Sequence, residues 1–251
     1  MLKQIRKNIF FQAVLIGLAV FNLMPAIVLG ANETTDQELF VKARKMYYNA
    51  EAPQSEAIKV LGRIKESLAN LPEGFDKYYW SANVAYLSGE MAEVAGDKQK
   101  AALDFTESNE LINKALNYNP KSSDANRVLA DTMMRLMNYK GAIYTMTKGP
   151  QVLKILKKAL DLDAKNYTAM NSLGMYYINA PAVGGGSADK GIEVLQKALE
   201  SKDHFDNFIS NVWLGSAFQK KKNSGEAKQY YQKALGIYPN SPWVKELLQN
   251  I

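Results

Sequence analysis

Cysteine is absent from the sequence, and histidine occurs once among its 251 residues, as His204. Without cysteine the chain forms no disulfide, holds no thiolate-bound metal and has no thiol nucleophile. A single histidine cannot build a histidine-rich metal centre. His204 lies in SKDHFD, where a solvated or capping histidine is favoured over a general base. Since no other catalytic constellation is visible, we expect no metal, no cofactor and no enzymatic activity.

A large excess of either charge is also missing. The chain has 31 basic and 25 acidic side chains, a formal net charge of +6. The first 30 residues contain Lys3, Arg6, Lys7 and no acid, which leaves 28 basic and 25 acidic side chains for the rest. Such a mildly basic body lacks the charge pattern of a nucleic-acid-binding protein. We therefore expect no nucleic-acid partner.

The N-terminus has the three parts of an export signal. Residues 1–8 (MLKQIRKN) are basic, and residues 13–21 (AVLIGLAVF) form an uninterrupted apolar run. The small residues of VLGA then allow cleavage after Gly30 or Ala31. This order predicts a signal peptide over residues 1–30 and an exported, periplasmic or envelope-associated protein.

The alternative for this region is an uncleaved membrane anchor over residues 9–30. Its 22 residues match the roughly 20 needed to cross a bilayer. Gln12, Asn22 and Pro25 interrupt its apolar character and favour the signal peptide. In the anchored case this segment is the only part expected to meet a membrane. The polar residues 31–35 are expected to be a disordered lead.

One motif recurs through the rest of the chain. Four segments carry Lys-Ala-Leu, with alanines at Ala115, Ala159, Ala198 and Ala234, separated by 44, 39 and 36 residues. A looser fifth copy, IKESLANLP, has Ser67 at the matching place. Periods of 20 to 50 residues are typical of solenoids, in which stacked units bury a continuous core.

The last copy indicates a pair of helices that pack closely. Ala227, Tyr231, Ala234 and Leu235 follow the spacing i, i+4, i+7 and i+8, which places them on one face of a helix. The small residues Gly215 and Ala234 allow two helix backbones to approach, and larger ones fill the gap to the next pair.

These residues carry a resemblance to a known family. The first helix of the last copy carries a leucine, a glycine and an aromatic residue, at Leu214, Gly215 and Phe218. The second carries a small residue, an aromatic residue, a second small residue and a proline, at Ala227, Tyr231, Ala234 and Pro239. With these spacings the chain resembles the tetratricopeptide repeat (TPR) family. The resemblance implies an all-α fold, a right-handed superhelix of about five stacked antiparallel helix pairs over residues 36–251. The segment SPWVKELLQNI is expected to be a C-terminal capping helix.

Two repeats are longer than the last one. Leu214 to Ala227 spans 13 residues, whereas Leu173 to Gly191 spans 18 and Leu129 to Val152 spans 23. The first insertion, of 5 residues, contains three glycines, and the second, of 10, includes NYKGAIYTMTKGP, expected to be mostly helix extension. The glycine insertion also makes the chain similar to exported bacterial TPR proteins such as those that accompany TRAP-type transporters.

The glycine insertion, Gly184, Gly185 and Gly186 followed by Ser187, has three interpretations. Ala180-Pro181 is expected to end one helix and Ser187 to cap the next. An inert turn is favoured, and a loop that contacts a partner is the alternative. A phosphate site is disfavoured, because a P-loop needs Gly-Lys-Ser/Thr and a dinucleotide site needs a preceding strand.

The TPR resemblance also implies a partner-binding face lined by the first helices. The residues that it places there are Arg127, Asp131, Met134, Arg135, Asn171, Met175 and Asn179. A peptide carboxylate could pair with Arg127 or Arg135, and the asparagines could hold its backbone. The alternative is a merely polar inner surface. The methionines of DTMMRLM are favoured as core residues over a pliable binding face.

The expected function is therefore that of a non-enzymatic, exported TPR scaffold for protein–protein or protein–peptide interaction in the cell envelope. An accessory subunit of a transport system that docks onto a solute-binding protein is the alternative. An enzyme that uses Gly184–Gly186 is the second alternative.

Overall fold

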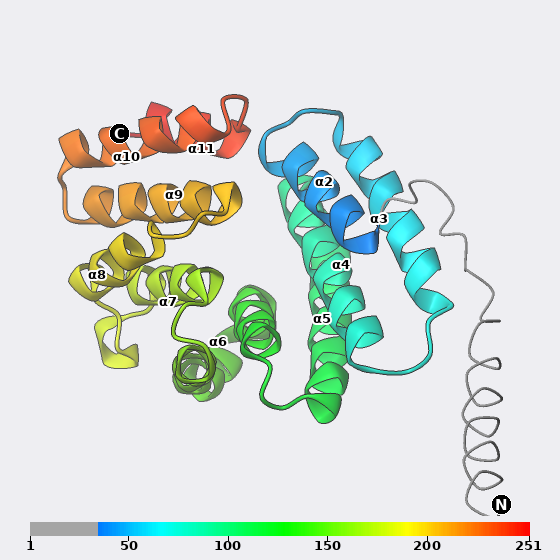
Figure 1. Cartoon of the computed structure of the whole chain (residues 1–251). Coiled ribbons are helices and arrows are strands. Elements are labelled where there is room, and N and C mark those ends of the chain that lie inside the picture. Colours follow the sequence, from blue (N-terminus) through cyan, green and yellow to red (C-terminus); the bar gives the residue numbers. More distant parts are fainter. Residues whose placement is uncertain (1–34) are drawn as a thin grey trace, which may run out of the picture. The chain divides into compact units, whose positions relative to one another are not determined.

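Ten α-helices and one short 3-10 helix make up residues 35–251, which the computed structural model describes (Figure 1). In chain order they are α2 (Asp36–Tyr48), α3 (Gln54–Ala69), α4 (Phe75–Val94), α5 (Lys98–Tyr118), α6 (Ser123–Leu162), α7 (Tyr167–Asn179), η1 (Ala182–Gly184), α8 (Ala188–Ala198), α9 (His204–Lys220), α10 (Ser224–Ile237) and α11 (Pro242–Gln249). No strand occurs among the residues described, and the all-α prediction is confirmed. The predicted signal peptide or anchor and residues 31–34 lie outside this range.

The helices pack in sequential pairs, as the repeat predicted. Gly141 has a φ of +77° and kinks α6, which divides it into a first half (residues 123–140) and a second half (residues 142–162). Met133 and Leu156, one from each half, belong to the same buried cluster. The pairs are thus α2–α3, α4–α5, the two halves of α6, α7–α8 and α9–α10, with α11 packed on α10. The result is a stack of five helix pairs closed by a C-terminal helix.

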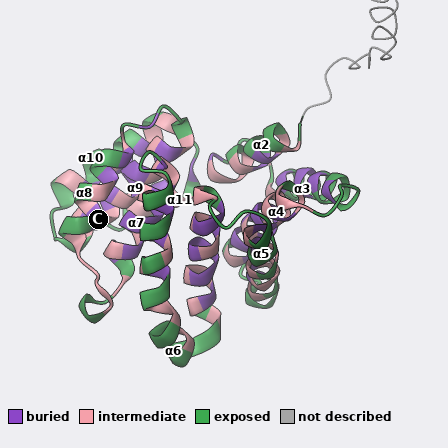
Figure 2. Cartoon of the chain, turned by 60° about the horizontal axis from the view of Figure 1, so that its bottom comes forward, coloured by how far each residue is buried: buried purple, intermediate pink, exposed green. Residues whose placement is uncertain are grey.

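The second helix of every pair buries three residues with the same spacing, four and then three apart. They are Ala57, Leu61 and Ile64 in α3; Ala101, Phe105 and Ser108 in α5; Val152, Leu156 and Ala159 in α6; Gly191, Leu195 and Ala198 in α8; and Ala227, Tyr231 and Ala234 in α10. This spacing keeps the three side chains on one helix face, against the first helix of the pair. Figure 2 shows the buried residues gathered between the helices and the exposed ones on their outer faces.

The structure corrects the register of the first repeat. Ser67, which the sequence aligned with Ala234, is exposed. Ile64 is fully buried in that position instead, one helical turn earlier. The motif IKESLANLP therefore resembles the other copies by composition but is shifted by three residues.

The second repeat is also shifted. In α5 the position of Ala234 is occupied by Ser108, and the Lys-Ala-Leu of Ala115 lies two turns further along this 21-residue helix. The extra turns bury Ile112 and Ala115 in a cluster with α4 and α6. The additional residues of this repeat thus lengthen α4 and α5 rather than form a loop.

Glycines allow close helix contacts within the pairs. A Cβ atom on Gly215 would overlap the ring of Tyr231, as the sequence predicted. Gly89 faces Phe105 in the same way, 16 residues later in both repeats. Gly174 meets Leu195.

Polar caps fix where the helices begin. Thr35, the last residue of the predicted lead, accepts a hydrogen bond from the Glu38 amide at the start of α2. Ser187 accepts from the Lys190 amide, so its predicted capping role is confirmed. α7 ends at Asn179, before Ala180-Pro181, as predicted. Among residues 35–251, no helix combines the length and the apolar character needed to span a bilayer.

Candidate functional site

The seven residues predicted for partner binding line two adjoining cavities formed mainly by the first helices of the pairs. The polar cavity has a volume of about 120 Å³ and the apolar groove about 710 Å³. The seven divide between them as follows: Arg127, Asp131 and Asn171 in the polar cavity, Met134 and Asn179 in the apolar groove, and Arg135 and Met175 in both.

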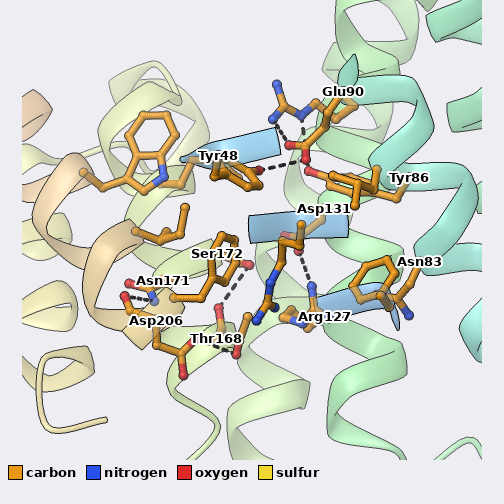
Figure 3. Close-up of a pocket in the computed structure, with 18 of the residues that line it drawn as sticks. Tyr48, Asn83, Tyr86, Glu90, Arg127, Asp131, Thr168, Asn171, Ser172 and Asp206 are labelled. Carbon is orange, nitrogen blue, oxygen red and sulfur yellow. Dashed lines mark hydrogen bonds and ion pairs between the residues drawn. The ribbon is translucent and has the colours of Figure 1, made fainter. Parts of the chain in front are cut away.

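A buried ion pair lies in the polar cavity (Figure 3). Arg127 donates from Nη1 to Oδ2 of Asp131 over 2.8 Å, one helical turn away on α6. Burial alone would lower the pKa of Arg127, but the Asp131 carboxylate raises it above its usual value. The other carboxylate oxygen of Asp131 and the Nε of Arg127 have no hydrogen-bond partner. The pair is therefore formed but incompletely satisfied.

Arg135 is held by two carboxylates of α4. It bonds Glu90 and lies 3.0 Å from Glu93, and its Nε donates to the hydroxyl of Tyr86 over 3.2 Å. Glu90 also accepts a 2.8 Å hydrogen bond from Tyr48. Burial raises the pKa of Glu90, although Arg135 opposes that shift. A peptide carboxylate would therefore have to displace one of the chain's own carboxylates to reach either Arg127 or Arg135.

Asn171 is similarly occupied. Its amide donates to the backbone oxygen of Asp206 over 3.0 Å, and its side-chain oxygen accepts from Ser210 over 2.6 Å. These bonds tie α7 to α9. Asn179, in contrast, is exposed, and its amide donates to the carbonyl of Met175 within its own helix.

The first and last repeats meet over the polar cavity. The ring of Tyr48, at the end of α2, lies 5.0 Å from that of Phe205 and 6.3 Å from that of Trp243. Arg44 stacks over the Phe205 ring at 3.8 Å. The backbone amide of Asn240 donates to the side-chain oxygen of Asn49 over 2.9 Å. Helix α2 thus contributes to a cavity that the sequence assigned only to α6 and α7.

The apolar groove is larger and contains four methionines. Its walls come from both halves of α6, from α7, from the turn after α7 and from Trp213 of α9. The methionines are Met134, Met137, Met146 and Met175. Arg135 is the one charged residue among the described residues that line it. Of the DTMMRLM methionines, Met133 is core as favoured, whereas Met134 and Met137 line this groove.

Apolar side chains lie exposed at and near this groove. Met146 and Val183, both in its lining, are 77% and 96% exposed, and Ile143, nearby on α6, is 81% exposed. Such a concentration of exposed apolar surface on a folded domain marks a contact site more often than a random surface does.

The two insertions of the sequence meet at this groove. The hydroxyl of Tyr176 lies 2.7 Å from the carbonyl oxygen of Gly184 and 3.2 Å from that of Gly149. Gly184 belongs to the glycine insertion and Gly149 to the longer insertion of the preceding repeat. Because consecutive pairs stack side by side, extra residues at the same end of each pair come together.

The glycine insertion is a compact turn. Gly186 donates its amide to Pro181 O over 3.0 Å and Ser187 to Tyr177 O over 2.8 Å. Gly185 has a φ of +88°, which favours glycine, and a Cβ on Gly186 would overlap the Ala180 carbonyl. Gly184 lines the groove, whereas Gly185, Gly186 and Ser187 support the turn behind it. Gly184 is thus the one residue of the four predicted for this loop that reaches the groove.

Sequence reasoning missed Tyr176, Met146, Val183 and Trp213 as groove residues. The sequence signal that could have indicated the groove was the position of the two insertions, which lie between corresponding helices of neighbouring repeats. Within residues 35–251 no cluster of histidine, cysteine or carboxylate side chains could hold a metal ion.

A family model described as Regulator of microtubule dynamics protein 1-3 matches residues 39–183, more than half of the chain. A second, described as Tetratricopeptide repeat, matches residues 210–241. No curated protein matches the chain. The TPR resemblance inferred from the last repeat is confirmed, and the likeness to TRAP-associated proteins stays a prediction.

Solved structures of TPR proteins resemble the fold. TTC0263, a thermophilic TPR protein in Thermus thermophilus, has a TM-score of 0.60 and 17% identity, covering 86% of this chain and 98% of that one. YrrB, described as a TPR protein with an unusual peptide-binding site, has a TM-score of 0.43 and 16% identity, covering 87% and 99%. MamA from Desulfovibrio magneticus RS-1 has a TM-score of 0.40 and 16% identity, covering 84% and 99%. At 17% identity the likeness to TTC0263 concerns the fold alone.

Proposed function

The chain belongs to the family described as Regulator of microtubule dynamics protein 1-3, and we propose that it is a non-enzymatic scaffold that binds a protein or peptide through the apolar groove. The observation that carries this proposal is the groove itself: about 710 Å³, apolar, and lined in part by strongly exposed side chains. Pockets of this size and character are typical of binding sites.

Partner capture by wild type and by two matched variants tests whether the chain binds a protein through the groove. The full chain is immobilised, and proteins of its native extract are captured and identified. Met146→Lys places a charge in the groove, whereas Leu103→Lys changes an apolar residue on α5 that is also largely exposed, at 64% against 77% for Met146. We expect a partner that wild type and Leu103→Lys retain and Met146→Lys loses. Equal capture by both variants would place binding elsewhere.

We propose further that this scaffold is exported and acts in the cell envelope. The basic, apolar and small-residue order of residues 1–31 supports this location. N-terminal sequencing of the protein from its own host distinguishes cleavage after Gly30 or Ala31 from an anchor over residues 9–30. An intact Met1 on membrane-embedded protein would reject cleavage. A transport accessory that docks onto a solute-binding protein is one form of such a scaffold.

The family description supports a second candidate, an interaction that affects microtubules. This candidate differs from the first in compartment and in partner. Co-sedimentation of the full chain with polymerised tubulin tests it directly. Pelleting that depends on the groove would favour this candidate, and the absence of pelleting would reject it.

A further inference from the structure

We infer that the apolar groove takes an acidic amphipathic segment of a partner protein, with its apolar side chains among the methionines and its carboxylates facing lysines of α6. This inference rests on the proposed scaffold function and adds the site and the chemistry of the partner. It also moves the site away from the polar cavity, where a TPR chain would be expected to receive a peptide.

The polar cavity is unsuited to a peptide because the chain fills it. Tyr48 and Arg44 enter from α2 and pack on Phe205 of α9. The space that remains is about 120 Å³, and its guanidinium groups on Arg127 and Arg135 already bond carboxylates. A peptide would have to separate α2 from α9 and break these ion pairs.

The apolar groove has room and is already formed. Its volume of about 710 Å³ suits several side chains of a bound segment. The Tyr176 hydroxyl links its two walls, and backbone hydrogen bonds fix the turn that carries Val183. Methionines adapt to ligands of different shape, because their side chains are unbranched and polarizable. Apolar side chains of a partner would therefore find contacts without rearrangement of the backbone.

The basic residues of α6 favour an acidic partner. Between Asp131 and Asp161 the sequence has no acidic residue, and its basic residues there are Arg135, Lys140, Lys148, Lys154, Lys157 and Lys158. Lys140 and Lys148 lie within or beside the stretches that line the groove. Within residues 35–251 neither has an ion-pair partner.

The local surroundings leave both lysines able to meet an anion. Lys140 is exposed and lies 5.5 Å from the centroid of the Tyr144 ring, and Lys148 donates a 3.2 Å hydrogen bond to Gln151. No acidic side chain lines the groove among the described residues. Carboxylates beside the apolar face of a bound segment would thus add attraction, and basic groups would add repulsion.

Two matched peptide probes test this inference against the full chain. Each is a labelled helix of about 16 residues, roughly four turns, with leucine at i, i+3, i+4 and i+7. One probe carries glutamate at the other positions and the second carries lysine. Fluorescence anisotropy should show binding of the acidic probe, weaker at high salt, and at least about tenfold weaker binding of the basic probe.

Variants locate the binding. Met146→Gln, which removes the apolar contact without adding charge, should weaken the acidic probe severalfold, and the matched change Leu103→Gln should leave it unchanged. Lys140→Glu with Lys148→Glu should weaken the acidic probe and strengthen the basic one. The control, Lys228→Glu with Lys245→Glu, changes two exposed lysines of α10 and α11 by the same charge and should do neither. Circular dichroism verifies folding of each variant.

Three outcomes overturn the inference. Equal binding of both probes would show that charge does not select the partner, and full binding of the acidic probe by Met146→Gln would show that the groove is not the binding site. Binding of vesicles of phosphatidylcholine and phosphatidylserine through Lys140 and Lys148, without binding of the acidic probe, would identify a membrane-binding surface instead. If the native partner is lost in Met146→Lys although the acidic probe is not preferred, the scaffold proposal stands and the acidic partner is wrong.

Discussion

The Tyr176 hydroxyl lies 2.7 Å from the carbonyl oxygen of Gly184, and the same hydroxyl lies 3.2 Å from the carbonyl oxygen of Gly149. One side chain thereby connects two insertions that are separated in the sequence by the last turns of α6 and by α7. The connection gives the apolar groove two walls with a fixed distance between them. The groove is consequently a property of two repeats together and of neither alone.

Removing this hydroxyl should loosen the groove with little loss of stability. For Tyr176→Phe we expect a decrease in the free energy of unfolding of about 0.5–1.5 kcal/mol, the usual net value of one hydrogen bond. Amide exchange in residues 182–187 should accelerate, which hydrogen-exchange mass spectrometry measures. Tyr177→Phe is the control, because its hydroxyl makes no hydrogen bond among residues 35–251. Equal exchange in both variants would show that Tyr176 does not hold the turn.

The corrected register gives a second prediction. Ala234 is fully buried, whereas Ser67, which the sequence placed in the same position, is exposed. Ala234→Leu should lower the free energy of unfolding by about 1–3 kcal/mol through overpacking. Ser67→Leu should lower it by less than about 1 kcal/mol, because only an exposed hydrogen bond to Asp36 is lost. Chemical denaturation of both variants decides the matter, and similar losses would mean that α3 is one turn out of place.

A third prediction concerns pH. Burial raises the pKa of Asp206, although hydrogen bonds from Thr168 and Ser201 oppose the shift. A carboxyl group whose pKa is raised by folding binds its proton more tightly in the folded state. Its contribution to stability is therefore full below the unfolded pKa of about 3.9 and is lost as pH rises through the folded pKa.

Asp206→Asn removes this titration. The stability of the variant relative to wild type should increase as pH rises from about 4 toward neutrality. Urea unfolding at several pH values measures the difference, and Asp189→Asn, at an exposed position of α8, controls for loss of charge. A relative stability that is constant with pH would contradict the raised pKa.

The contact of α2 with the last repeat supports a fourth prediction. Tyr48 packs on Phe205, Phe208 and Trp243. Tyr48→Ala should lower the free energy of unfolding by on the order of 3 kcal/mol, as for other large aromatic truncations. Tryptophan fluorescence should shift because Trp243 loses a neighbouring ring. Tyr48→Phe keeps the ring and should preserve the fluorescence, although the hydrogen bond to Glu90 is lost.

The sequence predicted those parts of the fold that local spacing determines. Ala227, Tyr231 and Ala234 follow one helical face, and Gly215 is small where helices meet, so the last repeat was correct in detail. The first repeats were misaligned because Ser67 and Ala115 share a motif that surface and core positions can both carry. Extra helical turns, as in α5, shift such a motif without changing its composition.

The candidate site was predicted in part, for a physical reason. Arg127, Asp131, Asn171 and their neighbours were placed on the correct helices because the repeat fixes which face of a first helix lies inside. Their pairing was not predictable, because Glu90 lies 45 residues from Arg135 and no local pattern connects them. The hydrogen bond between Asn49 and Asn240 spans 191 residues and is still further beyond such a pattern.

The hydrogen bond between Asn49 and Asn240 changes how the stack of helix pairs should unfold. In an open array each repeat contacts only its neighbours, so the terminal units fray first and unfolding proceeds inward. Here the terminal units support each other, through Asn49 with Asn240 and Tyr48 with Trp243. Among residues 35–251, both ends of the stack are therefore held by each other as well as by their neighbours. Removal of α11 should therefore destabilise α2 as well, and the five pairs should unfold in a single cooperative transition.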